Sequence, residues 1–399
     1  MTSTSLPVAA PAPSGRMQPA AAFALVVTIV IAFLAASSAP SPLYALYREA
    51  WGFSAFMLTL AFGSYAFALL AALLVFGALS DHLGRRTVIL AALLLEIVAV
   101  VLFWAADSIG WLLAARVLQG VATGIATSVL SAMLLDLHPA RGALFNGLAP
   151  MAGMALGALG TSALVQFAPQ PLHLVYEVLL AVFLLQTVLA WRLPETVARR
   201  PGAWRSLVPS AHVPQAARGP LLRALPLTTA GWALGGFFLS LGPTLARLVT
   251  GRDTPMIGGA LIATLVLTGA VSIYVVRQRS ALPVLRASAL LLGAGLAIAL
   301  AGVHLHSVFL FFGGTLVAGM GFGAGFNAAV RTLVPVAQPH ERAGLMATFF
   351  VLSYLAFSIP ALLAGLAVGV FGLHHTTLVY GALLIVLCAL AWAAARERR

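Results

Sequence analysis

The sequence predicts an all-α membrane protein of twelve transmembrane helices, arranged as two six-helix halves. Of its 399 residues, 61% are hydrophobic and only 8% are charged, and the mean hydropathy is +1.03. A soluble domain keeps roughly a quarter of its residues charged, so this composition requires a solvent other than water. Apolar runs of about 20 residues, the length that crosses a hydrocarbon core of ~30 Å, recur from Ala21 almost to the C-terminus.

The apolar runs follow one another with short polar connections, except for one longer polar stretch in the middle of the chain. They predict spans at residues 21–43, 55–79, 87–106, 110–135, 143–166, 172–192, 224–248, 255–276, 284–303, 306–330, 343–370 and 375–395.

The charged residues exclude several classes of protein. The formal net charge is +12, and all 22 basic residues are arginine, since the chain contains no lysine. Without lysine there is no phosphate-binding loop of the Gly-Lys-Ser/Thr type and no Schiff-base nucleophile. The arginines are not gathered on one soluble domain, so we expect no nucleic-acid partner. The single cysteine, Cys388, excludes disulfides and cysteine metal clusters within one chain.

The distribution of arginine predicts the orientation. With the N-terminus inside, eighteen arginines fall on inner segments, against three on outer segments (Arg48, Arg247 and Arg252), and Arg116 lies within a span. Basic residues favour cytoplasmic loops, so both termini are predicted in the cytoplasm. The arginine-only basic set and abundant alanine are typical of GC-rich bacterial codon usage. We therefore expect a multi-pass protein of a bacterial inner membrane.

The polar middle stretch divides the chain. It is rich in proline and arginine, and its only acid is Glu195. A faint internal repeat agrees with this division, because residues 77–80 (Gly-Ala-Leu-Ser) match residues 269–272 (Gly-Ala-Val-Ser). The predicted organisation is a disordered cytoplasmic tail (1–20), a six-helix bundle (21–192), a cytoplasmic linker (193–223), a second six-helix bundle (224–395) and a short cytoplasmic tail (396–399).

The most specific motif lies between the second and third spans, Gly77-Ala-Leu-Ser-Asp81-His-Leu-Gly84-Arg85-Arg86. Gly77 allows close helix approach, Gly84 permits a tight turn at positive φ, and Asp81 and Arg85 can form an ion pair. The segment resembles the signature of the major facilitator superfamily of transporters, Gly-x-Leu-x-Asp-x-x-Gly-Arg-Arg/Lys in the same loop. The resemblance implies that this cluster gates transport by latching the two halves in the outward-facing state.

Three further segments resemble the same family. Asp136, at the end of the fourth span, falls where the family places a helper to the loop motif, and we expect it to bind Arg85. Pro194-Glu195-Thr196 resembles the tripeptide that often closes the first half. Arg116-Val-Leu-Gln119 resembles a motif whose arginine faces the central cavity and is linked to proton coupling. The alternative for Arg116 is that it extends to the outer interface.

The acid that would pair with Arg116 stays open between two candidates. Glu96, in the third span, and Glu177, in the sixth, are both intramembrane carboxyl groups and either could carry a proton. The family's drug/proton exchangers often carry an acid in the first span, which here has none before Glu49. The Gly153-x-x-x-Gly157 segment falls where family antiporters carry a Gly-Pro motif, but small residues at this spacing also pack helices.

Polar and aromatic residues within otherwise apolar spans are candidates for a substrate cavity. Each could instead be a helix-packing residue. They are Gln119, Tyr44, Tyr65, Trp232, Asn327 and Tyr354. Histidines on the outer loops of the second half include His304 and His374, but no acid accompanies them, and we expect no metal and no cofactor.

The sequence therefore predicts a monomeric secondary transporter that moves a small amphipathic or neutral molecule by alternating access. Its expected partners are that molecule, protons or another coupling ion, and membrane lipid. Proton-coupled efflux is favoured, because the predicted cavity has few charges. Uptake of a neutral nutrient is the alternative, and a non-transporting membrane sensor is the alternative of another class. No catalytic constellation indicates an enzyme.

Overall fold

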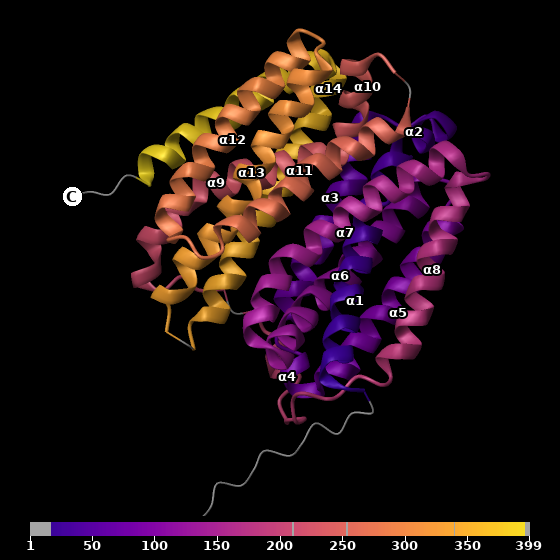
Figure 1. Ribbon diagram of the computed structural model, residues 1–399. Helices are drawn as coiled ribbons and strands as arrows, with labels where there is room; N and C mark the ends of the chain where they lie inside the picture. Colours follow the sequence, from indigo (N-terminus) through magenta and orange to yellow (C-terminus); the bar gives the residue numbers. More distant parts are fainter. Residues whose placement is uncertain (1–16, 210, 253, 339, 396–399) are drawn as a thin grey trace, which may run out of the picture.

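The computed structural model describes residues 17–209, 211–252, 254–338 and 340–395, and the described residues form helices without strands (Figure 1). Residues 1–16 and 396–399, which carry most of the two predicted tails, lie outside the described residues. The helices of the first half are α1 (Pro19–Ser38), α2 (Pro40–Trp51), α3 (Ala55–Phe76), α4 (Ser80–Leu83), α5 (Arg85–Trp104), α6 (Ile109–Leu137), α7 (Pro139–Phe167) and α8 (Pro171–Ala190).

The second half follows after a short 3-10 turn in the linker, η1 (Arg205–Leu207). Its elements are α9 (Gln215–Ser240), α10 (Gly242–Thr250), α11 (Pro255–Val276), α12 (Ala281–His304), α13 (Val308–Leu333), the 3-10 turn η2 (Val334–Val336) and α14 (Arg342–Ala394). Below, the face that carries α4 and the linker is named the inner face, after the orientation predicted from the arginines, and the opposite face is the outer face.

The structure has twelve spans when the bent pair α9 and α10 is counted as one span and the long helix α14 as two. Ten helices in the described part of the chain are long and apolar enough to cross a membrane, and α9 with α10, bent by 71°, forms an eleventh span. The 53 residues of α14 would extend about 80 Å as one helix, far more than a bilayer needs. Gly372, with φ of 77°, breaks it into two spans. The predicted all-α, twelve-span fold is confirmed.

Spans 1 and 7 are both interrupted at proline, near their outer ends. Pro40 begins α2 after a break at Ala39, and Pro243 lies in the first turn of α10. Proline cannot donate the backbone hydrogen bond that would continue the preceding helix, which favours a break at these positions. It does not force one, because Pro150 and Pro226 lie inside continuous helices. At its inner end, span 7 is longer than predicted, because α9 begins at Gln215, inside the stretch that the sequence assigned to the linker.

The helices of each half pack mainly with one another. In the first half α3 and α5 pack on α6, and α1 packs on α7; in the second half α12 packs on α13, and α9 on α14. The indigo-to-magenta and orange-to-yellow bundles of Figure 1 correspond to these two groups. Two helix pairs make most of the contact between the bundles, α7 with α11 and α3 with α14.

Small residues bring helices together at several of these contacts. A Cβ atom added at Gly153 would lie 2.5 Å from the Ile31 carbonyl oxygen of α1, and one at Gly259 of α11 would lie 2.6 Å from the Ala158 carbonyl oxygen of α7. Without a hydrophobic drive between helices in lipid, such close backbone approach is a main source of association. Gly153 therefore has a packing role, as one of the two interpretations of its motif expects.

Candidate functional site

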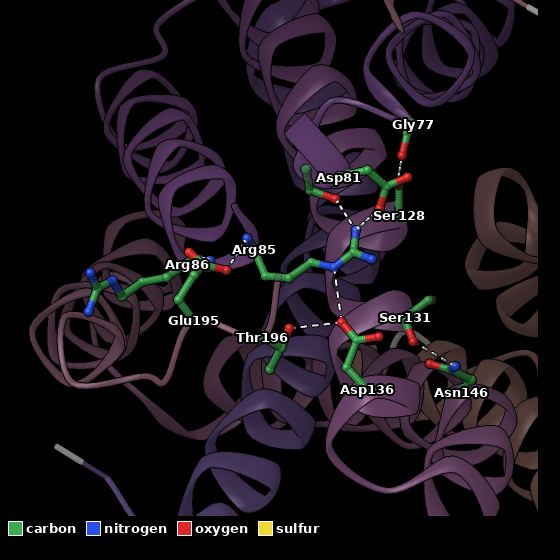
Figure 2. Close-up of polar contacts among 11 residues, drawn as sticks. Gly77, Asp81, Arg85, Arg86, Ser128, Ser131, Asp136, Asn146, Glu195 and Thr196 are labelled. Atoms are coloured by element: carbon green, nitrogen blue, oxygen red, sulfur yellow. Dashed lines mark hydrogen bonds and ion pairs between the residues drawn. The ribbon is translucent and has the colours of Figure 1, made fainter. Parts of the chain in front are cut away.

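The loop motif forms a compact charged cluster on the inner face (Figure 2). Arg85, only 8% exposed, lies at its centre. Its guanidinium pairs with Asp81 at 2.6 Å and with Asp136 at 3.1 Å, and its Nη1 also donates to Ser80 Oγ at 2.6 Å. The contacts predicted for Asp81 and Asp136 with Arg85 are confirmed. One cation is thus held between two carboxylates from α4 and α6.

Glu195 completes the cluster from the linker. Its two carboxylate oxygens accept hydrogen bonds from the backbone N–H groups of Arg85 (2.6 Å) and Arg86 (3.2 Å), which begin α5. The first N–H groups of a helix lack partners within the helix and carry partial positive charge, so a carboxylate there is stabilising. Sequence reasoning saw Glu195 only as part of a tripeptide and assigned it no site. Its signal was that it is the only acid in an arginine-rich stretch.

The two motif glycines allow the backbone conformation and the close contacts of this loop. Gly84 has φ of 91°, as predicted, and an added Cβ would lie 2.5 Å from Glu195 Oε2, so a side chain would displace the cap. The Gly77 carbonyl accepts a hydrogen bond from Ser128 Oγ of α6 at 2.6 Å, which ties the end of α3 to its neighbour. Nearby, Asn146 Nδ2 donates to the Ser131 carbonyl at 3.2 Å (Figure 2).

The cluster is also tied to the start of the linker. Thr196 Oγ1 donates to Asp136 Oδ2 at 2.8 Å, and Arg86 Nη1 donates to the Leu193 carbonyl at 3.4 Å. Further along, the Arg200 N–H donates to the His82 carbonyl at 3.0 Å. Among the described residues, the hydrogen bonds and ion pairs of the cluster all stay within the first half and the linker.

A second polar network is buried inside the first half, around Arg116 of α6. This side chain has no exposed surface. Its Nε donates to the Tyr44 hydroxyl at 2.7 Å and its Nη1 to the Ser37 carbonyl at 3.0 Å, and the Nη2 group also contacts Tyr44. The guanidinium carbon lies 5.2 Å from the centre of the Tyr65 ring, within the range of a cation–π interaction. Arg116 is therefore enclosed, and the alternative that it extends to the outer interface is wrong.

Gln119 links this arginine to Glu96. Its Oε1 accepts from Arg116 Nη1 at 2.7 Å, while its Nε2 donates to Glu96 Oε1 at 3.1 Å and to the Ala36 carbonyl at 3.1 Å. Glu96, on α5, is completely buried, and its second oxygen, Oε2, has no hydrogen-bond partner among the described residues. A buried guanidinium and a buried carboxyl group are thus connected through one amide. Sequence reasoning found all three residues but not this bridge.

Glu177 lies elsewhere. Its side chain is exposed on α8, and its Oε1 accepts a hydrogen bond from Trp104 Nε1 at 3.1 Å. Of the two candidate acids, Glu177 is therefore the wrong one: the hydrogen bonds of Arg116 go to Tyr44, Ser37 and Gln119. Hydropathy gave the depth of this residue in its span, but not the side of the helix on which it stands.

Three of the remaining cavity candidates, Tyr65, Trp232 and Tyr354, belong to one hydrophobic cluster where the two halves meet. Asn327 is half-buried on α13, and its Oδ1 has no hydrogen-bond partner among the described residues. The Tyr65 hydroxyl is 2.7 Å from Ser37 Oγ. In the second half, the ring of Trp232 lies 4.8 Å from that of Tyr354 and 5.7 Å from that of Phe357. Phe62 of α3 lies 4.8 Å from Phe357, across the contact between the halves. Sequence reasoning missed both phenylalanines, since an apolar residue in an apolar span carries no sign of which way it faces.

On the outer face, the described residues include an ion pair and a group of histidines. Arg247 of α10 lies 3.7 Å from Glu49 of α2, which joins the outer ends of spans 7 and 1. The ring of His374 lies 6.2 Å from that of His304 and 6.1 Å from that of His306. Among the described residues, no group of three His, Cys, Asp or Glu side chains has a geometry that could hold a metal ion.

Two bundles of membrane-spanning helices, a charged inner loop and a buried polar network define a multi-pass membrane protein of the transporter type. The family model of the Major Facilitator Superfamily matches residues 25–281. The chain belongs to this superfamily, and it is a membrane transporter of a small molecule. No curated protein matches it in sequence.

Solved structures share the fold over nearly the whole chain. The human organic anion transporter MFSD10 (TETRAN) is 19% identical, with a TM-score of 0.68, and the match covers 94% of this chain and 100% of that one. A mutant of the nucleoside transporter NupG is 11% identical with a TM-score of 0.72 and the same coverage. A bacterial homologue of the human lysosomal transporter Spinster, in an inward-facing and occupied conformation, is 13% identical with a TM-score of 0.72, covering 95% and 98%.

Proposed function

We propose that the protein exports an uncharged or amphipathic molecule across a bacterial inner membrane in exchange for protons. The two halves rock about a site between them, with both termini in the cytoplasm. The observation that carries the proposal is the buried hydrogen-bond network from Glu96 through Gln119 to Arg116 and Tyr44. Placing two ionisable groups this deep in a membrane costs free energy, so their presence there indicates a functional role.

Glu96 is the proposed proton carrier. When its carboxyl group is ionised, it balances the charge of Arg116 through Gln119, and the network is electrically neutral. When Oε2, the oxygen without a partner among the described residues, takes a proton, the network carries an uncompensated guanidinium in an apolar surrounding. The electrostatic cost of this charge is lower in a conformation that admits water to the network than in one that excludes it. Protonation of Glu96 therefore shifts the equilibrium between the inward-facing and outward-facing conformations, because only a difference in free energy between them can do so.

The inner cluster is the proposed gate. In the family it latches the halves in the outward-facing state, whereas here the polar contacts of its described residues stay within the first half and the linker. The outer ends are joined by Glu49 and Arg247, and Phe62 packs against Phe357 below them. This combination supports an inward-facing state, with the latch around Asp81 and Arg85 released.

The charges of the second half favour an uncharged or weakly polar solute. Its three acids, Asp253, Glu341 and Glu397, all fall outside the spans predicted for it. Trp232, Tyr354 and Phe357 supply aromatic surface instead. A largely apolar site with a few polar groups suits amphipathic ligands.

The test begins with a growth screen of deletion and overexpression strains against a compound panel, followed by flux of the best hit in proteoliposomes. In the Glu96→Gln variant, transport driven by an imposed proton gradient should fall by at least about tenfold. Exchange of solute in the absence of a gradient should continue, since that exchange needs no proton. The matched control is Glu177→Gln, which should keep both activities. Wild-type gradient-driven flux in the Glu96→Gln variant would exclude Glu96 as the coupling acid.

A further inference from the structure

An open groove lies between α11 and α13 near the outer face. Its walls are apolar side chains, Met256, Ile257 and Ala260 from α11 and Val308 and Phe312 from α13. The groove has a volume of about 540 Å³, within the range of about 300–1,000 Å³ that is typical of small-molecule sites. It therefore has room for a hydrocarbon chain, and it is separate from the inner cluster and from the buried polar network of the first half.

The groove opens on the side of the second half that is turned away from the first half. Ile262 of α11 is buried in the cluster where the halves meet. A helix turns by about 100° per residue, so Ala260 and Val271 lie roughly 160° and 180° around α11 from Ile262. Val271 is 63% exposed, and Leu316 and Met320 are exposed on the adjoining side of α13. Exposed apolar residues in membrane-spanning helices contact lipid, so the groove faces the hydrocarbon of the bilayer.

At its outer rim the groove carries a positive charge. Arg252, in the connection from α10 to α11, is among the lining residues together with Thr250, whose Oγ1 accepts a hydrogen bond from the Arg252 N–H at 3.3 Å. The Arg252 side chain is exposed, and its guanidinium makes no hydrogen bond or ion pair with the other described residues. Arginine is disfavoured on outer segments, and Arg247, another of the three predicted there, pairs with Glu49. Arg252 is thus available to a ligand at the membrane surface.

An arginine above an apolar groove matches the two parts of a phospholipid. A guanidinium binds a phosphate through two parallel charge-assisted hydrogen bonds. The depth also fits, because Ala260 lies five residues, or about 8 Å, along α11 from its start at Pro255. That depth is within the outer half of a hydrocarbon core of ~30 Å, where the first part of an acyl chain lies.

We propose that this groove binds a phospholipid of the outer leaflet, with its phosphate on Arg252 and one acyl chain between α11 and α13. The transported solute is a poorer match, since its site must be reached from both sides of the membrane, whereas this groove lies on the far side of α11 from the contact between the halves. The assignment goes beyond the proposed transport function and does not depend on the role of Glu96.

Three ligands that share parts of one lipid test the class. They are dioleoylphosphatidylglycerol, dioleoylglycerol (the same chains without phosphate) and glycerophosphoglycerol (the phosphate without chains). Native mass spectrometry of the delipidated full chain in detergent gives the affinity of each ligand without any transport. We expect the phospholipid to bind at least about fivefold more tightly than dioleoylglycerol, as one basic residue near the surface provides, and glycerophosphoglycerol not to bind. Equal binding of the two lipids, or binding of glycerophosphoglycerol as tight as that of the phospholipid, would overturn the proposal.

Variants of Arg252 locate the phosphate. Arg252→Gln should weaken binding of the phospholipid about fivefold and leave dioleoylglycerol unchanged. The matched control is Arg48→Gln, because Arg48 is an exposed arginine of α2 that lies outside the groove lining. Asp253 follows Arg252 in the sequence, and Asp253→Asn should not weaken phospholipid binding, since it removes a negative charge. Unchanged binding in Arg252→Gln, or weaker binding in Asp253→Asn, would refute the assignment of the phosphate.

A larger side chain in the groove locates the acyl chain. Ala260→Phe should weaken both lipids several-fold, because the ring occupies the space between α11 and α13. Leu267→Phe is the matched control, since Leu267 is exposed on the same side of α11 but does not line the groove. A phospholipid with a photoreactive group in its chain should label peptides of α11 or α13 in the wild type and lose this labelling in Ala260→Phe. Unchanged binding and labelling in a folded Ala260→Phe protein, judged by size-exclusion profile and thermal midpoint, would refute the site.

Discussion

The two halves of this transporter share a fold but differ in their use of charge. The first half keeps a buried guanidinium and a buried carboxyl group within its helices, and a cation between carboxylates at its inner loop. The second half has no acid in its predicted spans, and at the position that repeats the loop motif Arg277 lies over its own neighbour Tyr274 at 3.8 Å. The two halves thus repeat the helix packing, but the buried ionisable groups lie in the first half. This difference suits a transporter whose halves have different tasks.

The largest effect that would sharpen this comparison is expected at Arg116. The Arg116→Met substitution leaves Glu96 buried without its balancing charge, and breaking a buried pair costs about 3–5 kcal/mol. We expect the free energy of unfolding in detergent to fall by that order, and the double variant with Glu96→Gln to recover most of it. Arg286→Met, on the second half, is the matched control and should change stability little. Equal losses at the two arginines would end the distinction between the halves.

An intermediate effect is expected from comparing two glycines that both have positive φ. Gly84→Ala meets Glu195 as well as an unfavourable backbone conformation, whereas Gly372→Ala meets open space. Positive φ with extended ψ, as at both glycines, costs a residue with a side chain about 1–3 kcal/mol, and loss of a helix cap costs about 1 kcal/mol more. Thermal unfolding should therefore show Gly84→Ala as the more destabilising change. A larger loss at Gly372 would mean that the Glu195 cap contributes nothing.

The smallest effect is expected at the outer ion pair. Glu49 is 67% exposed in its side chain, so its attraction to Arg247 is screened and worth less than about 1 kcal/mol. Glu49→Gln should leave the thermal midpoint nearly unchanged but increase labelling of a cysteine placed near the outer end of α10, because the join between α2 and α10 loosens. Asp107→Asn serves as the control, because Asp107 is an exposed acid in the outer connection between α5 and α6. Unchanged labelling would show that the aromatic contact of Phe62 with Phe357 alone closes this face.

Much of the architecture could be predicted because hydropathy reports length directly, and because charges such as Asp81, Arg85 and Asp136 have few ways to be satisfied at a membrane surface. The rest depended on helix rotation and on long-range contacts. Glu96 and Glu177 both lie within predicted spans, yet only the rotation of their helices decides that one is enclosed and the other exposed. Glu195 caps a helix that begins 110 residues earlier in the chain, a contact that no local pattern contains.

The connection between the two halves has a mechanical consequence. The His82 ring nitrogen Nδ1 bonds the Pro201 carbonyl at 3.1 Å on the first half, and the His212 N–H donates to the Gly344 carbonyl at 3.3 Å on the second. Ten residues separate Pro201 from His212, and a chain of that length reaches roughly 35 Å when extended. Three of the residues between them are coiled in the turn η1 (Arg205–Leu207), so the connection is shorter than its full reach and can lengthen before it pulls on either bundle. Shortening the connection residue by residue would measure how far the bundles move apart.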